Sequence, residues 1–394
     1  MKSSGNDITQ ISATTPRPRL EVVDGLRGLA CLMVLGFHGW LSSRCPVATF
    51  WNPLGFGHAG VNLFLLLSGF CLYRPMLRAG KEPRLWPFLQ ARARRILPPY
   101  YVALALCVVA AILLPRAWWP STPDGGLQEI LHSMPWHLLM IHNLSPDHVM
   151  LINGPFWSLA LEVNLYLAMP ILVLLTRRFG VIWMVAVAAV VTLIFRFEMD
   201  AMMGGKAGWL AAGNAVAFVI CNSLPGRWVE FALGMWAAKL SMRPPVTRHS
   251  WLLVIPGLLC ILAASWLNFH VGLFSPPAEP LFGLGFFLLI LNVLDPRSFA
   301  HRIFSSRALV SLGVISYSVY LVHVPLLEAL VAMTGIGSSQ ARYLLPAIFL
   351  VILPVIVLIA YFFHHKFEAP FIRPAKTTAP LNPEALSEAA QSRA

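Results

Sequence analysis

Apolar stretches of about 20 residues recur along the whole chain and leave few folds open to it. A helix needs about 17 to 25 predominantly apolar residues to span a bilayer, and about ten segments meet this requirement. They begin near Leu26, His58, Leu97, Phe156, Phe179, Gly226, Trp251, Pro280, Ala308 and Tyr343, and the first, sixth and eighth are short or interrupted. Only 12% of the 394 residues are charged, whereas a soluble domain is about 25% charged. The sequence therefore predicts an all-α, polytopic membrane helical bundle with about ten transmembrane helices.

The positions of the basic residues predict the orientation of this bundle. With an even number of spans both termini lie on one side, and if that side is the cytoplasm, 22 of the 29 lysines and arginines are cytoplasmic. Arg74 lies within the second span, and the outer segments hold the other six, which are Arg44, Arg116, Arg196, Lys206, Arg227 and Arg342. By the positive-inside rule both termini are cytoplasmic. The net charge of +12 then reflects the orientation of the protein in the membrane, and we expect no nucleic-acid partner.

The two ends of the chain differ from the apolar middle. Residues 1–20 are expected to form a polar cytoplasmic N-terminus, residues 21–371 the transmembrane domain, and residues 372–394 a disordered cytoplasmic tail. The six cysteines show no metal-binding spacing, so we expect no metal site.

The first span begins with charged residues, in DGLRGLACLMVLGFH at residues 24–38. Arg27 and His38 lie about three helical turns apart, so they face nearly the same way about 16 Å apart along the axis. A charged group at the centre of a membrane helix costs at least about 2.5 to 3.5 kcal/mol. A neutral His38 avoids most of this cost, and a neutral imidazole is what a general base requires. The alternatives are an interfacial anchor for Arg27 and a hydrogen-bonded packing residue for His38.

Polar stripes mark two further spans. Ser158, Glu162 and Tyr166 follow one another at four-residue intervals and share one face of the fourth span. A glutamate about two turns inside a span is a candidate functional residue, although it could also be a structural partner of an arginine or histidine. Tyr320 and His323 share a face of the ninth span, and we expect that face to point into the bundle.

The segment QARARRILPPYY places Arg92 and Arg95 three residues apart, on the cytoplasmic side of the third span. The planar guanidinium of arginine is suited to bidentate binding of phosphate. The alternative is the ordinary excess of arginine in cytoplasmic loops.

Taken in order, these segments resemble the membrane acyltransferase-3 family, bacterial multi-pass O-acyltransferases that modify surface polysaccharides, lipopolysaccharide, Nod factors and macrolides. The resemblance covers residues 20 to 371 and is carried by LEVVDGLRGLACLMVLGFH, GVNLFLLLSGFCL, RARRILPPYY, FWSLALEVNLYLAMP and ISYSVYLVHVP. Two features depart from the family. Asn62 stands where the family often has Asp, and Glu162 is followed by Val-Asn-Leu rather than by Glu-Gln-Phe.

The resemblance implies an enzyme of the bacterial inner membrane with no permanently bound cofactor. It would move an acyl group, most simply acetyl, from cytoplasmic acyl-CoA to a hydroxyl of a carbohydrate, a lipid-linked glycan or a macrolide. The essential residues that it implies are Arg27, His38, Arg92 and Arg95.

These implications and the polar stripes together predict three groups of site residues. His38, as general base, with Arg27 and Glu162 would be catalytic. Arg27, Arg92 and Arg95 would bind the phosphates of the donor. The acceptor side would hold Tyr166, Tyr320 and His323. A covalent acyl intermediate on His38 is left open as a variant.

A proton-coupled transporter is the alternative function, because buried His, Glu and Arg also mark proton relays. The sequence has no detectable internal repeat, a feature that many transporters show, and this counts against the alternative. A purely structural or sensory membrane protein would not need ionisable groups so deep in the bilayer.

Overall fold

The computed structural model describes residues 20–43, 52–80, 85–116, 119, 124, 126–202, 215–242, 250–272, 275–335 and 341–372, and within these residues it contains helices and no strand. The longer helices are α1 (Glu21–Ser42), α2 (Gly60–Ala79), α3 (Leu85–Leu113), α4 (Gly126–Leu138), α5 (Phe156–Phe179), α6 (Val181–Met202), α8 (Trp228–Leu240), α9 (Val254–His270), α10 (Ala278–Val293), α12 (Arg307–Met333) and α14 (Leu353–Phe363). The all-α fold predicted from the sequence is confirmed.

Short helical segments connect these helices. They are η1 (Pro53–Ala59), η2 (His142–Leu144), α7 (Ala215–Cys221), η3 (Pro225–Arg227), η4 (Ser250–Leu253), α11 (Phe299–Phe304), α13 (Ala341–Ala347), η6 (Ile348–Ile352), η7 (His364–Glu368) and η8 (Ala369–Phe371). The predicted N-terminus 1–20 and tail 372–394 lie outside the described residues, apart from Leu20 and Ile372.

Eight helical segments within the described residues are long and apolar enough to cross a membrane. They contain α1, α2, α3, α5, α6, α9, α12 and α14. The sixth and eighth predicted spans correspond to the shorter helices α8 and α10, which have 13 and 16 residues. Large apolar side chains such as Trp183, Leu258 and Phe362 are exposed on these helices, as expected for a surface that lipid covers. The protein is a multi-pass membrane protein.

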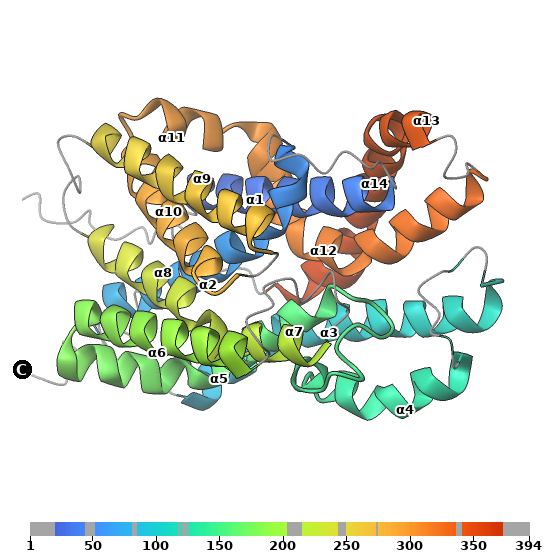
Figure 1. The fold of residues 1–394 in the computed structure, drawn as a ribbon, viewed down its shortest axis with the longest axis horizontal. Coiled ribbons are helices and arrows are strands. Elements are labelled where there is room, and N and C mark those ends of the chain that lie inside the picture. Colours follow the sequence, from blue (N-terminus) through green and yellow to red (C-terminus); the bar gives the residue numbers. More distant parts are fainter. Residues whose placement is uncertain are drawn as a thin grey trace, which may run out of the picture. The chain divides into compact units, whose positions relative to one another are not determined.

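The first two spans lie at the centre of the helical unit Glu21–Phe371. In the most apolar window of the α1 span and of the η1–α2 span, 67% and 72% of residues are buried, against 22% for the α9 span. Helix α1 packs along α12, and α2 packs along α8 (Figure 1). A polar residue carried by α1 or α2 is therefore positioned to face other helices rather than lipid.

Glycine allows the backbones of α1 and α12 to approach closely. A Cβ atom on Gly28 would lie 2.2 Å from the carbonyl oxygen of Leu309, and one on Gly313 would lie 1.7 Å from that of Asp24. Without a strong hydrophobic drive between helices in lipid, such close backbone packing is a main source of association. The glycines of the first span thus bring α1 against the helix that carries His323.

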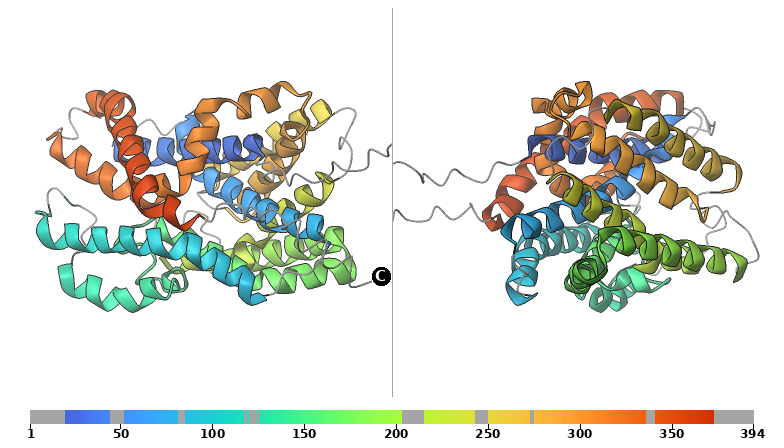
Figure 2. Two further views of the ribbon diagram at one scale, coloured as in Figure 1. Left: turned by 180° about the vertical axis from the view of Figure 1, so that it is seen from behind. Right: turned by 90° about the vertical axis from the view of Figure 1, so that its left-hand side faces the viewer.

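Figure 2 shows α5 and α6 running side by side, and α14 crossing α12. The contact among α1, α12, η6 and α14 is a packed apolar core that includes Leu35, Ile315, Val319, Ile348 and Ile356. This core holds α12 in a fixed position beside α1.

Candidate functional site

His38 and His323 lie side by side where α1 meets α12. The Nε2 atom of His323 is 3.2 Å from the Nδ1 atom of His38, and the ring centroids are 4.9 Å apart. His323 is 1% exposed, and His38 is partly buried. The structure therefore joins the two histidines of the first and ninth predicted spans, inside the bundle. We call them the histidine pair.

The hydrogen bonds of the histidine pair select the tautomer of each ring. The Nδ1 atom of His38 lies 3.0 Å from the Val34 carbonyl oxygen, and that of His323 lies 2.9 Å from the Tyr320 carbonyl oxygen. Because a carbonyl oxygen can only accept, both Nδ1 atoms are assigned as N–H donors. The Nδ1–H of His38 is then shared between Val34 and the Nε2 lone pair of His323. The proton-accepting lone pair of His38 is consequently on Nε2, as a general base requires.

Ser158 of α5 reaches the histidine pair through Tyr320. The Oγ atom of Ser158 and the hydroxyl of Tyr320 are 2.5 Å apart. The Tyr320 hydroxyl also donates to the Pro155 carbonyl oxygen at 3.2 Å, and its ring centroid lies 5.5 Å from that of His323. Tyr320 and His323, both predicted on the acceptor side, are thus adjacent and tied to the start of α5.

Glu162 and Tyr166 continue the same face of α5, and both contact Ser68 of α2. Ser68 Oγ donates to Glu162 Oε1 at 2.7 Å, and the Tyr166 hydroxyl donates to the same oxygen. Tyr166 was expected beside the acceptor. It lies with Glu162, two helical turns along α5 from Ser158, and its place beside the acceptor stays a prediction.

Two of the predicted arginines lie within electrostatic range of Glu162. Arg27 and Arg92 both interact electrostatically with this carboxylate, and Nη1 of Arg27 lies 3.6 Å from Oδ1 of Asp24. Arg95, one turn further along α3, is close enough to Arg92 to repel its charge. We call Arg27, Arg92 and Arg95 the arginine group. It concentrates positive charge where the sequence predicts the cytoplasmic mouth, which is what an anionic donor would need.

One face of α5 connects the arginine group to the histidine pair. Ser158 contacts Tyr320 beside the pair, whereas Glu162 interacts with the arginines. Each four-residue step along the face rises about 6 Å, so the stripe from Ser158 to Tyr166 covers about 12 Å. This face of α5 therefore has the histidine pair at one end and the arginine group at the other.

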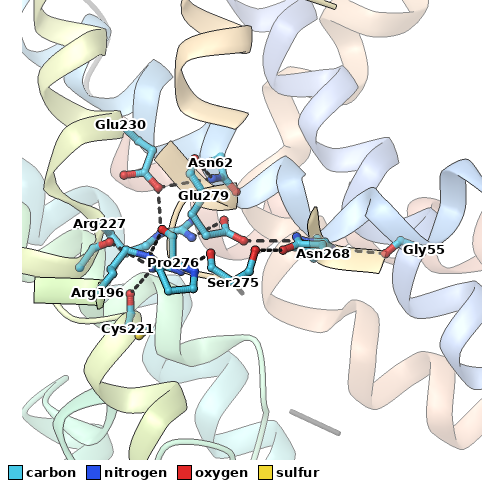
Figure 3. Close-up of polar contacts among 12 residues, drawn as sticks. Gly55, Asn62, Arg196, Cys221, Arg227, Glu230, Asn268, Ser275, Pro276 and Glu279 are labelled. Atoms are coloured by element: carbon cyan, nitrogen blue, oxygen red, sulfur yellow. Dashed lines mark hydrogen bonds and ion pairs between the residues drawn. The ribbon is translucent and has the colours of Figure 1, made fainter. Parts of the chain in front are cut away.

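A third polar cluster, which the sequence did not predict, lies between α2, α8 and α10 (Figure 3). Nε of Arg227 is 3.1 Å from Oε1 of Glu230, and its Nη1 forms an ion pair with Glu279. All three side chains are at most 1% exposed. Asn62 Nδ2 is 3.3 Å from Glu230 Oε1 and 3.1 Å from the Glu279 carbonyl oxygen, and donates to both. The asparagine that departs from the family pattern thus gives hydrogen bonds to a site that already holds two carboxylates.

The same cluster shows how two basic residues of the predicted outer segments are held. Arg196 and Arg227, which the sequence places in the outer segments, are 0% and 1% exposed. Arg196 donates to the carbonyl oxygens of Pro276 at 2.9 Å and of Cys221 at 3.0 Å. The three-residue spacing of Arg227 and Glu230 was the available signal, because residues so spaced adjoin on a helix.

Comparison with known proteins identifies the family. Residues 20–365 match the family model described as "Acyltransferase domain". The chain belongs to the acyltransferase-3 family. Together with its apolar helices, this makes the protein a membrane acyltransferase.

Relatives of this acyltransferase share about a quarter of its residues. It is 28% identical over 324 residues to BcsY of Komagataeibacter xylinus, covering 79% of this chain and 73% of that protein. It is 25% identical over 339 residues to the peptidoglycan O-acetyltransferase OatA of Listeria monocytogenes, covering 79% and 50%. It is 27% identical over 317 residues to the acyltransferase MdmB of Streptomyces mycarofaciens, covering 77% and 78%. The match spans only half of the Listeria protein, and no solved structure matches the chain.

Proposed function

We propose that this acyltransferase moves an acyl group, most simply acetyl, from cytoplasmic acyl-CoA to a hydroxyl of a carbohydrate or glycosylated acceptor. The observation that carries the proposal is the histidine pair, in which the His38 Nδ1–H is engaged by Val34 and His323. The similarity to a peptidoglycan O-acetyltransferase supports a hydroxyl-bearing glycan as acceptor. A lipid-linked glycan and a macrolide fit the same chemistry. Because acyl-CoA is cytoplasmic, the enzyme would act in the bacterial inner membrane.

His38 is the general base in this proposal. Its Nε2 takes the proton of the acceptor hydroxyl while the oxygen attacks the thioester carbonyl carbon. The tetrahedral intermediate then collapses, the carbon–sulfur bond breaks, and the departing CoA sulfur takes the proton back from Nε2. Proton transfer by a positioned histidine contributes about 10²- to 10⁴-fold. No net proton is produced, so His38 returns to its starting state.

The arginine group binds the donor in this proposal. The guanidinium groups of Arg27, Arg92 and Arg95 bind the phosphates of CoA by charge-assisted hydrogen bonds. The pantetheine arm then extends along the α5 face toward His38. Glu162, which accepts hydrogen bonds from Ser68 and Tyr166, orients the arginines electrostatically.

Tyr320 and His323 complete the opposite end. His323 holds the His38 tautomer, and Tyr320 lies next to it at the point where the acceptor arrives. This arrangement brings donor and acceptor to one imidazole from the two faces of the membrane.

The test is acyl transfer in membrane vesicles of defined orientation. Radiolabelled acetyl-CoA is added to inverted vesicles from cells that produce the protein, so that the label reaches the cytoplasmic face. We expect base-labile label in the membrane glycan fraction, because mild alkali releases O-acetyl but not N-acetyl groups. Right-side-out spheroplasts should incorporate none. Equal labelling from both sides would contradict the cytoplasmic donor, and no labelling from either would contradict the function.

The same preparation separates this function from a proton-coupled transporter. CoA binding should raise the melting temperature of the purified acyltransferase, and it should do so less in the Arg92→Ala variant. A transporter would give no response to CoA.

A further inference from the structure

Pro325 leaves a gap in the hydrogen bonding of α12. In an α-helix the N–H of each residue donates to the carbonyl oxygen four residues earlier, and proline has no N–H. Pro325 lies inside α12 and is buried, so the Leu321 carbonyl oxygen loses its helical donor. A buried carbonyl without a donor is costly, so such groups nearly always find another partner.

Asn153 supplies that partner from another part of the chain. Its Nδ2 atom donates to the Leu321 carbonyl oxygen at 2.9 Å, and Asn153 is 1% exposed. The neighbouring residue Ile152 has a φ of 67°, a left-handed conformation that is rare for a β-branched residue. Such strain persists only where surrounding contacts hold it. The hydrogen bond to Leu321 is one such contact.

Two more contacts join the same two segments. The Tyr320 hydroxyl lies 3.2 Å from the Pro155 carbonyl oxygen and 2.5 Å from Ser158 Oγ. Residues 153–158 are therefore tied to one turn of α12 from two directions. That turn also places His323, whose Nδ1–H donates to the Tyr320 carbonyl oxygen.

We propose that Asn153 is a positioning residue: by replacing the donor that Pro325 removes, it fixes the turn of α12 that holds His323 against His38. The effect on catalysis rests on the function proposed above, whereas the hydrogen bond itself does not. Asn153 acts through the helix and need not touch either substrate.

A double-mutant cycle tests this role, because Pro325→Ala gives α12 back its own donor. In the parent chain, Asn153→Ala should lower the melting temperature by several degrees, since it leaves the Leu321 carbonyl unpaired. In the Pro325→Ala background, Asn153→Ala should lower the melting temperature much less, because the N–H of the new alanine donates to the Leu321 carbonyl oxygen. Asn143→Ala is the matched control. Asn143 lies in the same connecting segment, is 1% exposed, and its amide has no hydrogen-bond partner among the described residues. Asn143→Ala should lower the melting temperature by the same amount in both backgrounds.

Turnover shows whether the hydrogen bond also positions the base. Asn153→Ala should lower kcat for acetyl transfer about 10-fold at unchanged KM for acetyl-CoA, as expected when alignment rather than binding is lost. Pro325→Ala should restore part of that loss. Normal kcat in a less stable Asn153→Ala protein would overturn the positioning role.

Equal costs of Asn153→Ala in both backgrounds would overturn the hydrogen-bond replacement. If Asn153→Ala alone does not fold, the yield of monodisperse protein replaces the melting temperature as the measurement. If Pro325→Ala then fails to restore that yield, the proposal is contradicted. His38→Gln is measured in parallel. Wild-type transfer by that variant would contradict the proposed function while leaving the thermal cycle as a valid test of Asn153.

Discussion

The Nε2 atom of His323 lies 3.2 Å from the Nδ1 atom of His38, on a helix 285 residues further along the chain. Because His323 presents a lone pair there, it favours the His38 tautomer whose Nε2 can accept a proton. The Val34 carbonyl oxygen favours the same tautomer from within α1. A local partner, Val34, and a distant partner, His323, therefore favour the same tautomer of His38.

His323→Phe keeps an aromatic ring beside His38 but removes the distant partner. We expect kcat for acetyl transfer to fall about 2- to 10-fold, the equivalent of one neutral hydrogen bond of about 0.5 to 1.5 kcal/mol. The loss stays moderate because Val34 still accepts from Nδ1. The measurement is steady-state transfer from acetyl-CoA at matched protein amounts, and unchanged kcat would show that His323 does not orient the base.

Arg92→Ala should weaken donor binding without preventing chemistry. One charge-assisted hydrogen bond is worth about 1.5 to 3 kcal/mol, so the dissociation constant of CoA should rise about 10- to 100-fold. Arg94→Ala is the matched control, because Arg94 is exposed on the same helix whereas Arg92 is partly buried. Isothermal titration with CoA measures both variants. If both variants bind CoA equally weakly, the loss reflects the net charge of this helix rather than a specific site at Arg92.

Asn62→Asp should destabilise the cluster around Arg227. It places a third carboxylate beside Glu230 and Glu279 and leaves a buried charge without compensation, which typically costs about 3 to 5 kcal/mol. Adding Glu230→Gln returns the cluster to two carboxylates and should restore most of the melting temperature. A double variant no more stable than Asn62→Asp would rule out charge balance as the reason.

The segment between α4 and α5 that carries His142 should lose stability in acid. His142 is 0% exposed, and burial lowers its pKa to about 3. Its ring stacks on that of His137 at 4.1 Å. An unfolded histidine titrates near pH 6.5, so the unfolded chain takes up protons that the folded chain refuses. The stability from His142 is complete above about pH 6.5 and falls by about 1.4 kcal/mol per pH unit on the way toward pH 3.

His142→Phe keeps the stacked ring and removes this titration. Melting temperatures measured from pH 7.5 to 5 should therefore fall less steeply in the variant than in the parent chain. His132→Asn, which changes an exposed histidine of α4, is measured as the control. Parallel slopes for His142→Phe and the parent would show that His142 is already protonated or exposed in the folded protein.

Sequence patterns predicted what each helix contributes but not which helices meet. Apolar length located eight helical segments within the described residues that can cross a membrane, whereas two expected spans are the shorter helices α8 and α10. A four-residue spacing placed Ser158, Glu162 and Tyr166 on one face. Periodicity does not say which neighbour that face touches, so the contacts of Glu162 and Tyr166 with Ser68 of α2 could not be predicted. The ion pair of Arg227 with Glu279 joins residues 52 positions apart, and no local spacing encodes such a pair.

Asn153 illustrates the same limit for single hydrogen bonds. Pro325 within an apolar span indicates that a carbonyl four residues earlier needs a new donor. The donor is 168 residues away in the chain, and only the packing of the segment before α5 against α12 selects it. The need for a partner can be read from the sequence, whereas the partner cannot.

Single-turnover acetyl transfer by the His38→Gln variant tests the central claim most directly. The purified variant is loaded with acetyl-CoA and compared with the parent protein and with His365→Gln, which changes an exposed histidine near the end of the last span. We expect His38→Gln to bind CoA normally and to transfer acetyl at least about 100-fold more slowly, and we expect His365→Gln to match the parent protein. Transfer by His38→Gln at the parent rate would contradict the role of His38 as general base.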